Sequence, residues 1–275
     1  MKKLSRILSV LLILSLTLFM CACNIQLPED NYSGNTDSGF KDDASIEENE
    51  LDYIEIANNV TSDAVKFNVK IDAYFYKSGY FGFSQAVSGS QGSGVIYKSD
   101  EKYYYVLTNA HVVEYNGDYN VAEYTVYDMY GNEYKSELLA SAAEYDLAAL
   151  RFTKDSKIAL GTVEFAEELP VSRDVVITLG TPKGQINAVT WGRVATFRKI
   201  QPSPDSENPV AIEFDVIVHT CLVEHGASGG ALINTDMKLV GVNYALAGDE
   251  NKDVSYGLAI PIDKVIEFLE NNALL

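Results

Sequence analysis

The chain has 275 residues, of which 39 are acidic and 21 basic, so its formal net charge is −18. This charge argues against nucleic acid as a partner, because phosphate binding depends on clustered lysine and arginine. Apolar residues make up 47% of the sequence, a share typical of a globular protein. Three cysteines and three histidines leave little room for a disulfide framework or a histidine-rich metal site, so we expect no metal and no cofactor.

The first 22 residues predict an export signal. A basic start precedes an apolar run over residues 7–20, which is short for a helix that spans a membrane. The run ends in Ala22-Cys23, and a small residue before a cysteine at this place resembles the lipobox of bacterial lipoproteins. The resemblance implies cleavage after Ala22 and lipidation of Cys23, which would anchor the protein to a bacterial membrane outside the cytoplasm. An ordinary cleaved signal peptide is the alternative.

Residues 23–59 predict an acidic, disordered tether. Ten carboxylates face a single lysine, Lys41, among Asn, Ser and Gly. Such a segment has too little apolar surface to order itself. A short helix over residues 51–59 is the one element that we consider there, and the folded domain is expected to occupy residues 60–275.

Short β-rich segments fill most of this domain. Residues 65–75 alternate apolar and polar side chains with the period of a strand. Further strand-like segments, separated by Gly, Asn, Asp and Pro, lie at residues 93–97, 103–108, 123–127, 175–179, 188–195, 211–218 and 239–244. The pattern of residues 261–272 predicts a helix, since Pro261 suits a first turn and the apolar positions share one face. We therefore predict a mainly antiparallel β domain with a C-terminal helix.

The three histidines limit the choice of a general base. His111 directly follows the strand-like segment 103–108, and Ser228 lies in Gly226-Ala227-Ser228-Gly229-Gly230. Glycines around a serine allow a sharp turn that aims backbone N–H groups at one point, as an oxyanion hole requires. Gly-x-Ser-x-Gly also fits the nucleophile elbow of α/β-hydrolases, but there the histidine follows the serine, and no histidine follows Ser228.

The order His before Asp before Ser remains, and it requires an acid between His111 and Ser228. Asp146 heads an apolar run and is our candidate, because a carboxylate there could be buried beside a packed segment. The other aspartates have turn-like or alternating surroundings and are expected at the surface; they are Asp128, Asp155, Asp174 and Asp215.

Several motifs in fixed order carry a family resemblance. They are Gly92-Ser93-Gly94-Val95-Ile96, Thr108-Asn109-Ala110-His111-Val112-Val113, Asp146-Leu147-Ala148-Ala149-Leu150 and Gly226-Ala227-Ser228-Gly229-Gly230-Ala231-Leu232. Together they resemble trypsin-like serine peptidases of the HtrA (Deg) type over about residues 54–272. The resemblance implies an all-β fold of two six-stranded barrels, at about residues 60–160 and 161–260, with the active site between them and a C-terminal helix.

The resemblance also implies roles for residues. Ser228 would be the nucleophile, His111 the general base and Asp146 its orienting acid. The oxyanion turn would be formed by Gly226, Ala227 and Ser228. The primary specificity pocket would be formed by Leu222, Asn243, Tyr244 and Ala245. Because Leu222 cannot neutralise a buried cation, we expect a small or medium apolar residue before the cleaved bond.

Two departures from the family qualify this reading. Members usually carry Asn or Asp where this chain has Ala227, and a methyl group cannot make that hydrogen bond or ion pair. Members usually also carry C-terminal PDZ domains, which we do not expect here. The predicted function is an HtrA-like endopeptidase that cleaves unfolded or flexible protein segments in extracytoplasmic quality control or processing. The alternatives are a catalytically idle binding or chaperone-like lipoprotein and a secreted esterase.

Two further features have competing interpretations. The aromatic stretch of residues 74–83 lies where HtrA-type proteins carry an exposed loop, so it could form a homotrimer or simply pack on the barrel. His219, Cys221 and His225 are close in sequence, but they lack a fourth ligand at zinc spacing. We interpret them as strand-end and loop residues.

Overall fold

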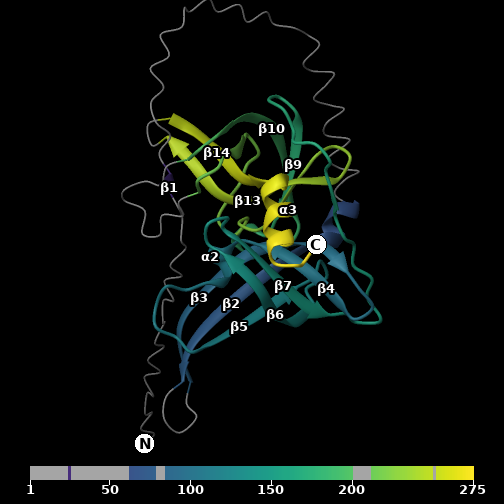
Figure 1. The fold of residues 1–275 in the computed structure, drawn as a ribbon, viewed down its shortest axis with the longest axis vertical. Coiled ribbons are helices and arrows are strands. Elements are labelled where there is room, and N and C mark those ends of the chain that lie inside the picture. Colours follow the sequence, from purple (N-terminus) through teal and green to yellow (C-terminus); the bar gives the residue numbers. More distant parts are fainter. Residues whose placement is uncertain (1–23, 26–61, 79–83, 201–211, 250–251) are drawn as a thin grey trace, which may run out of the picture.

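The computed structural model describes residues 24–25, 62–78, 84–200, 212–249 and 252–275 (Figure 1). The predicted signal peptide, Cys23, the proposed helix at residues 51–59 and nearly all of the acidic segment lie outside these ranges. The described residues form two closed barrels of six antiparallel strands each, with a helix after the second barrel. The predicted fold class is therefore confirmed.

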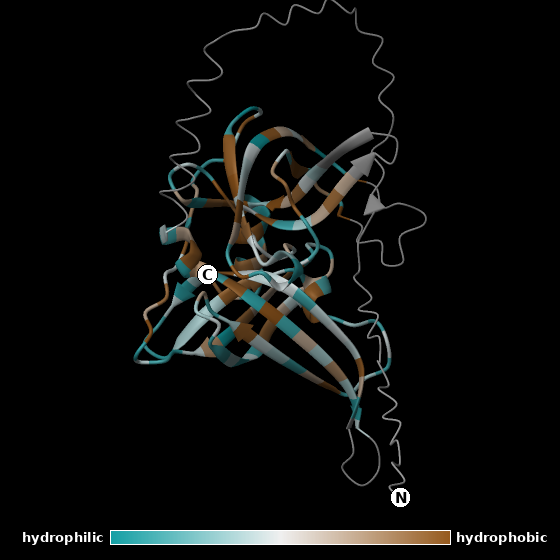
Figure 2. Cartoon of the chain, turned by 180° about the vertical axis from the view of Figure 1, so that it is seen from behind, coloured by the Kyte–Doolittle hydropathy of each residue, from teal (hydrophilic) through white to brown (hydrophobic). Residues whose placement is uncertain are grey.

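The first barrel is built from a single stretch of chain. Its strands are β2 (Asn68–Ser78), β3 (Ser84–Ser99), β4 (Tyr103–Thr108), β5 (Val121–Tyr127), β6 (Glu133–Ala142) and β7 (Leu147–Thr153). They close in the order β2-β3-β4-β7-β6-β5. Successive side chains of a strand point to opposite faces, so Ile71, Ala73 and Phe75 fill the interior while Tyr74 is 45% exposed. Figure 2 shows this alternation as bands of hydropathy along the strands.

The strand predicted from residue 65 begins later than expected. Val65–Phe67 forms a turn of 3₁₀ helix, η1, and β2 begins at Asn68. Val65 and Phe67 are both buried, and a single turn that buries two residues produces the same apolar spacing as a strand. Asp72, whose place in the alternation predicts an exposed side chain, is buried because Lys70 Nζ and Gln91 Nε2 lie 2.7 and 3.0 Å from its carboxylate.

The second barrel follows a connection that contains β8 (Glu164–Phe165). Its strands are β9 (Val175–Gly180), β10 (Ala188–Arg198), β11 (Val216–His219), β12 (Ala231–Ile233), β13 (Lys238–Asp249) and β14 (Lys252–Pro261). They run in the order β13-β12-β9-β10-β11-β14, and β14 pairs back with β13. Two short strands, β8 and β1 (Asn24–Ile25), add to β13 in parallel. The segment predicted at residues 211–218 is a strand only from Val216 onward.

The C-terminal helix α3 (Ile262–Asn271) connects the barrels. It starts at the end of β14 and extends toward the first barrel (Figure 1). There the Tyr145 hydroxyl donates to Glu267 Oε1 at 2.7 Å, and the Tyr145 ring lies 6.3 Å from that of Phe268. Apolar side chains of both barrels and α3 form one continuous buried cluster. None of the helices in the described ranges is long and apolar enough to cross a bilayer.

Candidate active site

Strand pairing brings His111 and Asp146 together at one end of the first barrel. β4 pairs with β7 so that Thr108 lies opposite Ala148. His111 lies in α2 (Ala110–Val113), a short helix that begins at the second residue after β4. Asp146 directly precedes β7. The predicted base and acid, 35 positions apart in the sequence, are therefore neighbours in the fold.

The Asp146 carboxylate is buried and faces His111. Its Oδ2 lies 2.8 Å from Nδ1 of the imidazole, and its Oδ1 accepts a 3.0 Å hydrogen bond from the backbone N–H of His111. The Asp146 side chain is only 1% exposed, whereas that of His111 is 20% exposed. A carboxylate accepts hydrogen bonds, so the network assigns the proton to Nδ1 and makes Nε2 the basic nitrogen. This is the tautomer that can take a proton from a hydroxyl at Nε2.

The backbone of Asp146 is held in an uncommon conformation. Its φ of +50° is in the left-handed region, which aspartate tolerates better than most residues. The side-chain amide of Asn109 donates to the Asp146 carbonyl at 2.9 Å, and this bond is buried. Asn109 therefore ties the turn that carries the acid to the segment that carries His111.

Ser228 lies in a turn of the second barrel that reaches the first barrel. φ is positive at Gly226 (+96°) and Gly229 (+85°). A Cβ placed on Gly229 would lie 2.3 Å from Thr108 Oγ1 and 2.2 Å from the Ser93 carbonyl oxygen. Glycine is therefore required for this approach. Since Thr108 ends β4, the turn meets the same end of β4 from which α2 and His111 follow.

Backbone contacts fix Ser228 between the barrels. Its carbonyl accepts a 2.8 Å hydrogen bond from the N–H of Ser93 on β3. Its Oγ lies 3.4 Å from the carbonyl oxygen of Tyr244 on β13. The hydroxyl, the imidazole and the buried carboxylate thus come from loops that converge where the two barrels meet.

Two N–H groups of the Ser228 turn make no hydrogen bond to the described residues. Other amides of the turn bond within the fold: Ala227 to Glu224, Gly230 to Ala227 and Gly229 to Asn243. The N–H groups of Gly226 and Ser228 have no acceptor among the described residues. Paired, unsatisfied N–H groups beside a hydroxyl are able to stabilise an oxygen that gains negative charge.

The residues predicted to line the specificity pocket do not share one environment. Leu222 is 64% exposed, and Tyr244 is buried. The buried Asn243 amide bonds within the fold, to Nε2 of His219 at 3.1 Å and to the Ala231 carbonyl at 3.1 Å. Asn243 therefore supports the strand under the nucleophile turn. Ala245 is partly exposed on the same strand.

His219 and Cys221 are buried below the Ser228 turn, and each is held in its neutral form. Burial lowers the pKa of His219 to about 4, so the ring is neutral. Burial raises the pKa of Cys221 to about 12, which keeps it a thiol. No set of three or more His, Cys, Asp or Glu side chains with metal-binding geometry occurs in the described ranges.

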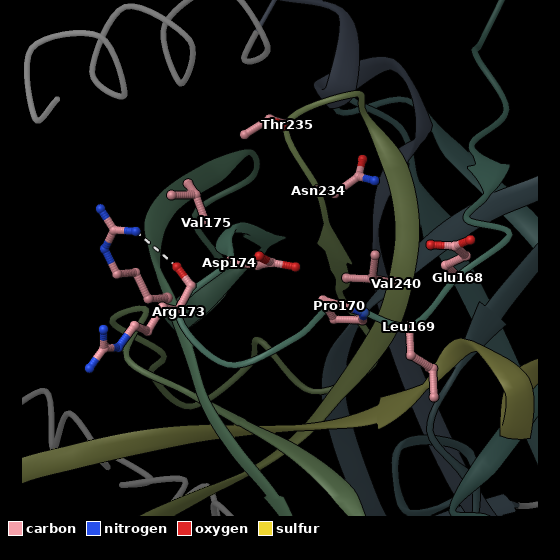
Figure 3. Close-up of a pocket in the computed structure, with 10 residues that line it drawn as sticks. Glu168, Leu169, Pro170, Arg173, Asp174, Val175, Asn234, Thr235 and Val240 are labelled. Carbon is pink, nitrogen blue, oxygen red and sulfur yellow. Dashed lines mark hydrogen bonds between the residues drawn. The ribbon is translucent and has the colours of Figure 1, made fainter.

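A separate cavity lies at the far side of the second barrel. It has a volume of about 450 Å³ and is lined by Arg173, Asp174, Glu168 and Asn234 with apolar neighbours (Figure 3). His111, Asp146 and Ser228 are not part of its lining. This cavity is therefore separate from the residues of the predicted triad.

Sequence reasoning missed the residues that support this site. Asn109 makes a buried hydrogen bond to the loop of Asp146, and Ser93 and Thr181 make partly buried ones to the loop of Ser228. The flanking glycines of Ser93 were the available signal, because glycines on a strand indicate close approach of another backbone.

Comparisons with known proteins agree with this architecture. A family model described as "Trypsin-like peptidase domain" matches residues 92–242. The chain is 31% identical over 184 residues to "Serine protease Do-like HtrA" of Bacillus subtilis, covering 66% of this chain and 39% of that protein. It is 32% identical over 178 residues to a "Probable periplasmic serine endoprotease DegP-like" of Halomonas elongata, covering 65% of this chain and 34% of that protein.

A third relative is the "Probable periplasmic serine protease do/HhoA-like" of Haemophilus influenzae, 28% identical over 184 residues, or 64% of this chain and 37% of that protein. The chain belongs to the trypsin-like peptidase domain family. Within that family, the relatives described here are serine proteases of the HtrA and DegP type, and the chain spans less than two fifths of their length.

Proposed function

We propose that this protein is a serine endopeptidase in which Ser228, His111 and Asp146 form a catalytic triad. The observation that carries the proposal is the buried Asp146 carboxylate 2.8 Å from Nδ1 of His111, at the same end of the first barrel that the Ser228 turn approaches. A buried acid in this position favours the imidazolium that forms during catalysis. Family membership independently supports peptide hydrolysis.

The proposed reaction has two halves. Ser228 Oγ attacks the carbonyl carbon of the substrate and its proton moves to His111 Nε2, while the N–H groups of Gly226 and Ser228 bind the oxyanion. The C–N bond then breaks as His111 returns the proton to the leaving amine, which leaves an acyl ester on Ser228. Water attacks this ester, His111 accepts its proton and delivers it to Ser228 Oγ, and the carboxylic acid departs.

The proposed substrates are unfolded or flexible protein segments. Attack by a fixed serine requires an extended backbone at the junction of the barrels, which a folded chain rarely offers. The relatives' names, which describe serine proteases and endoproteases, support protein as the substrate class. Assembly as a homotrimer through residues 74–83 stays a prediction. Within that stretch, Phe75 is buried against Tyr115 and Tyr119, and residues 79–83 are outside the described ranges.

The proposed location is outside the cytoplasm, with the folded domain at residues 60–275 held to a membrane by lipidated Cys23. The support is the sequence of residues 1–23 and the word "periplasmic" in the names of two relatives. The acidic residues up to 59 would be repelled by an anionic membrane surface, and this repulsion would hold the domain away from it. Mass spectrometry of the mature N-terminus tests this: an unmodified Cys23 would remove the anchor.

Active-site labelling tests the catalytic proposal. A fluorophosphonate probe should label the wild-type protein and leave Ser228→Ala unlabelled, because the probe reacts with an activated serine. Cleavage of casein by Ser228→Ala should fall by about 10⁶-fold in kcat. Ser136→Ala, a change at a strand serine of the first barrel that bonds the Tyr124 carbonyl, is the matched control. Absence of wild-type labelling would favour the alternative of a catalytically idle binding protein. Ala227 supports that alternative, because it lacks the polar side chain that family members usually carry at this position.

Peptide profiling tests the proposed specificity. Leu222 carries no charge, so we expect cleavage after small or medium apolar residues. The comparison is a library that varies only the residue before the cleaved bond. Preferred cleavage after Lys or Arg would contradict the assignment of Leu222 to the pocket.

A further inference from the structure

The Ser93 hydroxyl joins three parts of the molecule at one buried point. Ser93 belongs to β3 of the first barrel and has no exposed surface. Its Oγ donates to the Gly226 carbonyl at 2.6 Å. It also accepts the backbone N–H of Thr181 at 2.8 Å, and it lies 3.0 Å from Thr181 Oγ1. Thr181 directly follows β9, so this hydroxyl pair ties the first barrel to both the second barrel and the nucleophile turn.

The Ser93 and Thr181 hydroxyls both contact one peptide plane in that turn, through the Gly226 carbonyl. A trans peptide is planar, and its C=O and N–H point in opposite directions. The His225 carbonyl is bound by the N–H of Lys183 at 2.9 Å, and the Ala227 carbonyl by the N–H of Gly230 at 2.9 Å. These two bonds aim the N–H groups of Gly226 and Ser228 away from the turn. The Gly226 carbonyl belongs to the plane between them, and Ser93 binds it from across the barrel junction.

Ser93 makes the shorter of two side-chain contacts to the Gly226 carbonyl, at 2.6 Å against 3.4 Å for Thr181 Oγ1. Ala227 is buried, and its methyl group makes no hydrogen bond. Its Cα and Cβ would lie 3.2 and 3.3 Å from a Cβ on Gly180, so the backbone is packed tightly there. The glycine before Ser93 faces the same turn, since a Cβ on Gly92 would lie 3.0 Å from the Ser228 carbonyl oxygen.

We propose that Ser93, supported by Thr181, is a positioning residue that holds the oxyanion turn in its competent conformation. It does so through the Gly226 carbonyl, in a chain whose residue before the nucleophile has no polar side chain. The proposal rests on the proposed function, because it assumes that the Gly226 and Ser228 N–H groups receive the oxyanion. It predicts that loss of the hydroxyl weakens transition-state binding more than substrate binding.

The test separates kcat from KM. Ser93→Ala should lower kcat on a peptide substrate by about tenfold or more, below the 10²–10³ measured for loss of a direct oxyanion donor, with KM changed less than about twofold. Affinity for a peptide aldehyde, whose adduct with serine carries the oxyanion, should fall by the same factor as kcat/KM. Thr181→Val, which keeps the shape and removes the hydroxyl, should show a smaller loss of the same kind. Ser136→Ala should change none of these quantities.

The outcomes distinguish this proposal from the proposed function. If the wild-type protein reacts with the fluorophosphonate but Ser93→Ala keeps wild-type kcat and aldehyde affinity, the positioning role is wrong and the triad stands. If apparent kcat falls only in proportion to a lower folded fraction in thermal unfolding, while KM and aldehyde affinity stay at wild-type values, Ser93 is merely structural. Should Ser93→Ala fail to fold, Thr181→Val decides, and its retention of full kcat would overturn the proposal. A wild-type protein that the probe does not label would refute the proposed function itself.

Discussion

His219 is a neutral histidine enclosed beneath the nucleophile turn. Its Nε2 lies 3.1 Å from Asn243 Oδ1, whereas its Nδ1 has no hydrogen-bond partner within the described ranges. A Cβ on the facing Gly257 would lie 2.1 Å from the ring, so the site has no spare volume. Protonation would add a charge with no compensating group, which is why the pKa falls from 6.5 to about 4.

This burial predicts that stability declines with acid. Between pH 6.5 and 4 the unfolded chain binds a proton at His219 that the folded chain does not, so folding weakens as pH falls through that window. From pH 7.5 to 5 the loss from this residue is about 2 kcal/mol. Urea unfolding at the two pH values measures it. His219→Gln, which cannot titrate, should lose about that much less than the wild type over the same interval. An equal loss in both proteins would show that His219 is not the group responsible.

The residues of the site differ in how well sequence could find them. His111 and Ser228 could be predicted from the sequence, because the chain has few histidines and glycines surround the serine. Asn243 was predicted to line the pocket, and the structure adds a supporting role, because its side chain bonds His219 and the Ala231 carbonyl. Ser93 was visible only as part of a motif. The roles of Asn243 and Ser93 depend on which loops meet at the barrel junction, and spacing along the chain does not contain that information.

At the scale of elements, a strand was predictable where its pattern is pure. The segment predicted at residues 103–108 coincides with β4, in which every residue except Leu107 is aromatic or β-branched. Strands β6, β7, β12 and β14 were not predicted, and β6 and β14 show why. β6 mixes Glu, Lys and Ser with its apolar residues, and β14 contains Gly257, so pairing with neighbours rather than local propensity makes them strands.

Helix α3 is predicted to stabilise the first barrel through Phe268. This side chain is fully buried and lies beside Tyr145, the residue before Asp146. Phe268→Ala should lower the free energy of unfolding by about 3–5 kcal/mol, because it removes a large buried ring and leaves a cavity. Urea unfolding measures the change, and Glu270→Ala on the exposed face of α3 is the control. A loss below about 1 kcal/mol would show that α3 docks without help from this ring.

At the scale of the whole molecule, sequence predicted the architecture through ordered motifs rather than through strand patterns. Periodicity indicated an antiparallel β protein and one terminal helix, but the number of barrels followed from the resemblance. The reason is physical: barrel closure requires β5 to pair with β2 and β14 with β13. Of these two pairings, only β13 with β14 joins strands that are consecutive in the chain, and a local pattern does not specify the other.

The hydrogen bond from the Ser93 N–H to the Ser228 carbonyl connects the two barrels, each of which has its own closed sheet. A small shift of one barrel relative to the other would break this hydrogen bond, although every strand would keep its partners within its own barrel. Heat or mild denaturant should therefore abolish peptide cleavage before circular dichroism detects any loss of β-sheet. The contact between the barrels, and not the stability of either barrel, would then set the highest temperature at which the protein is active.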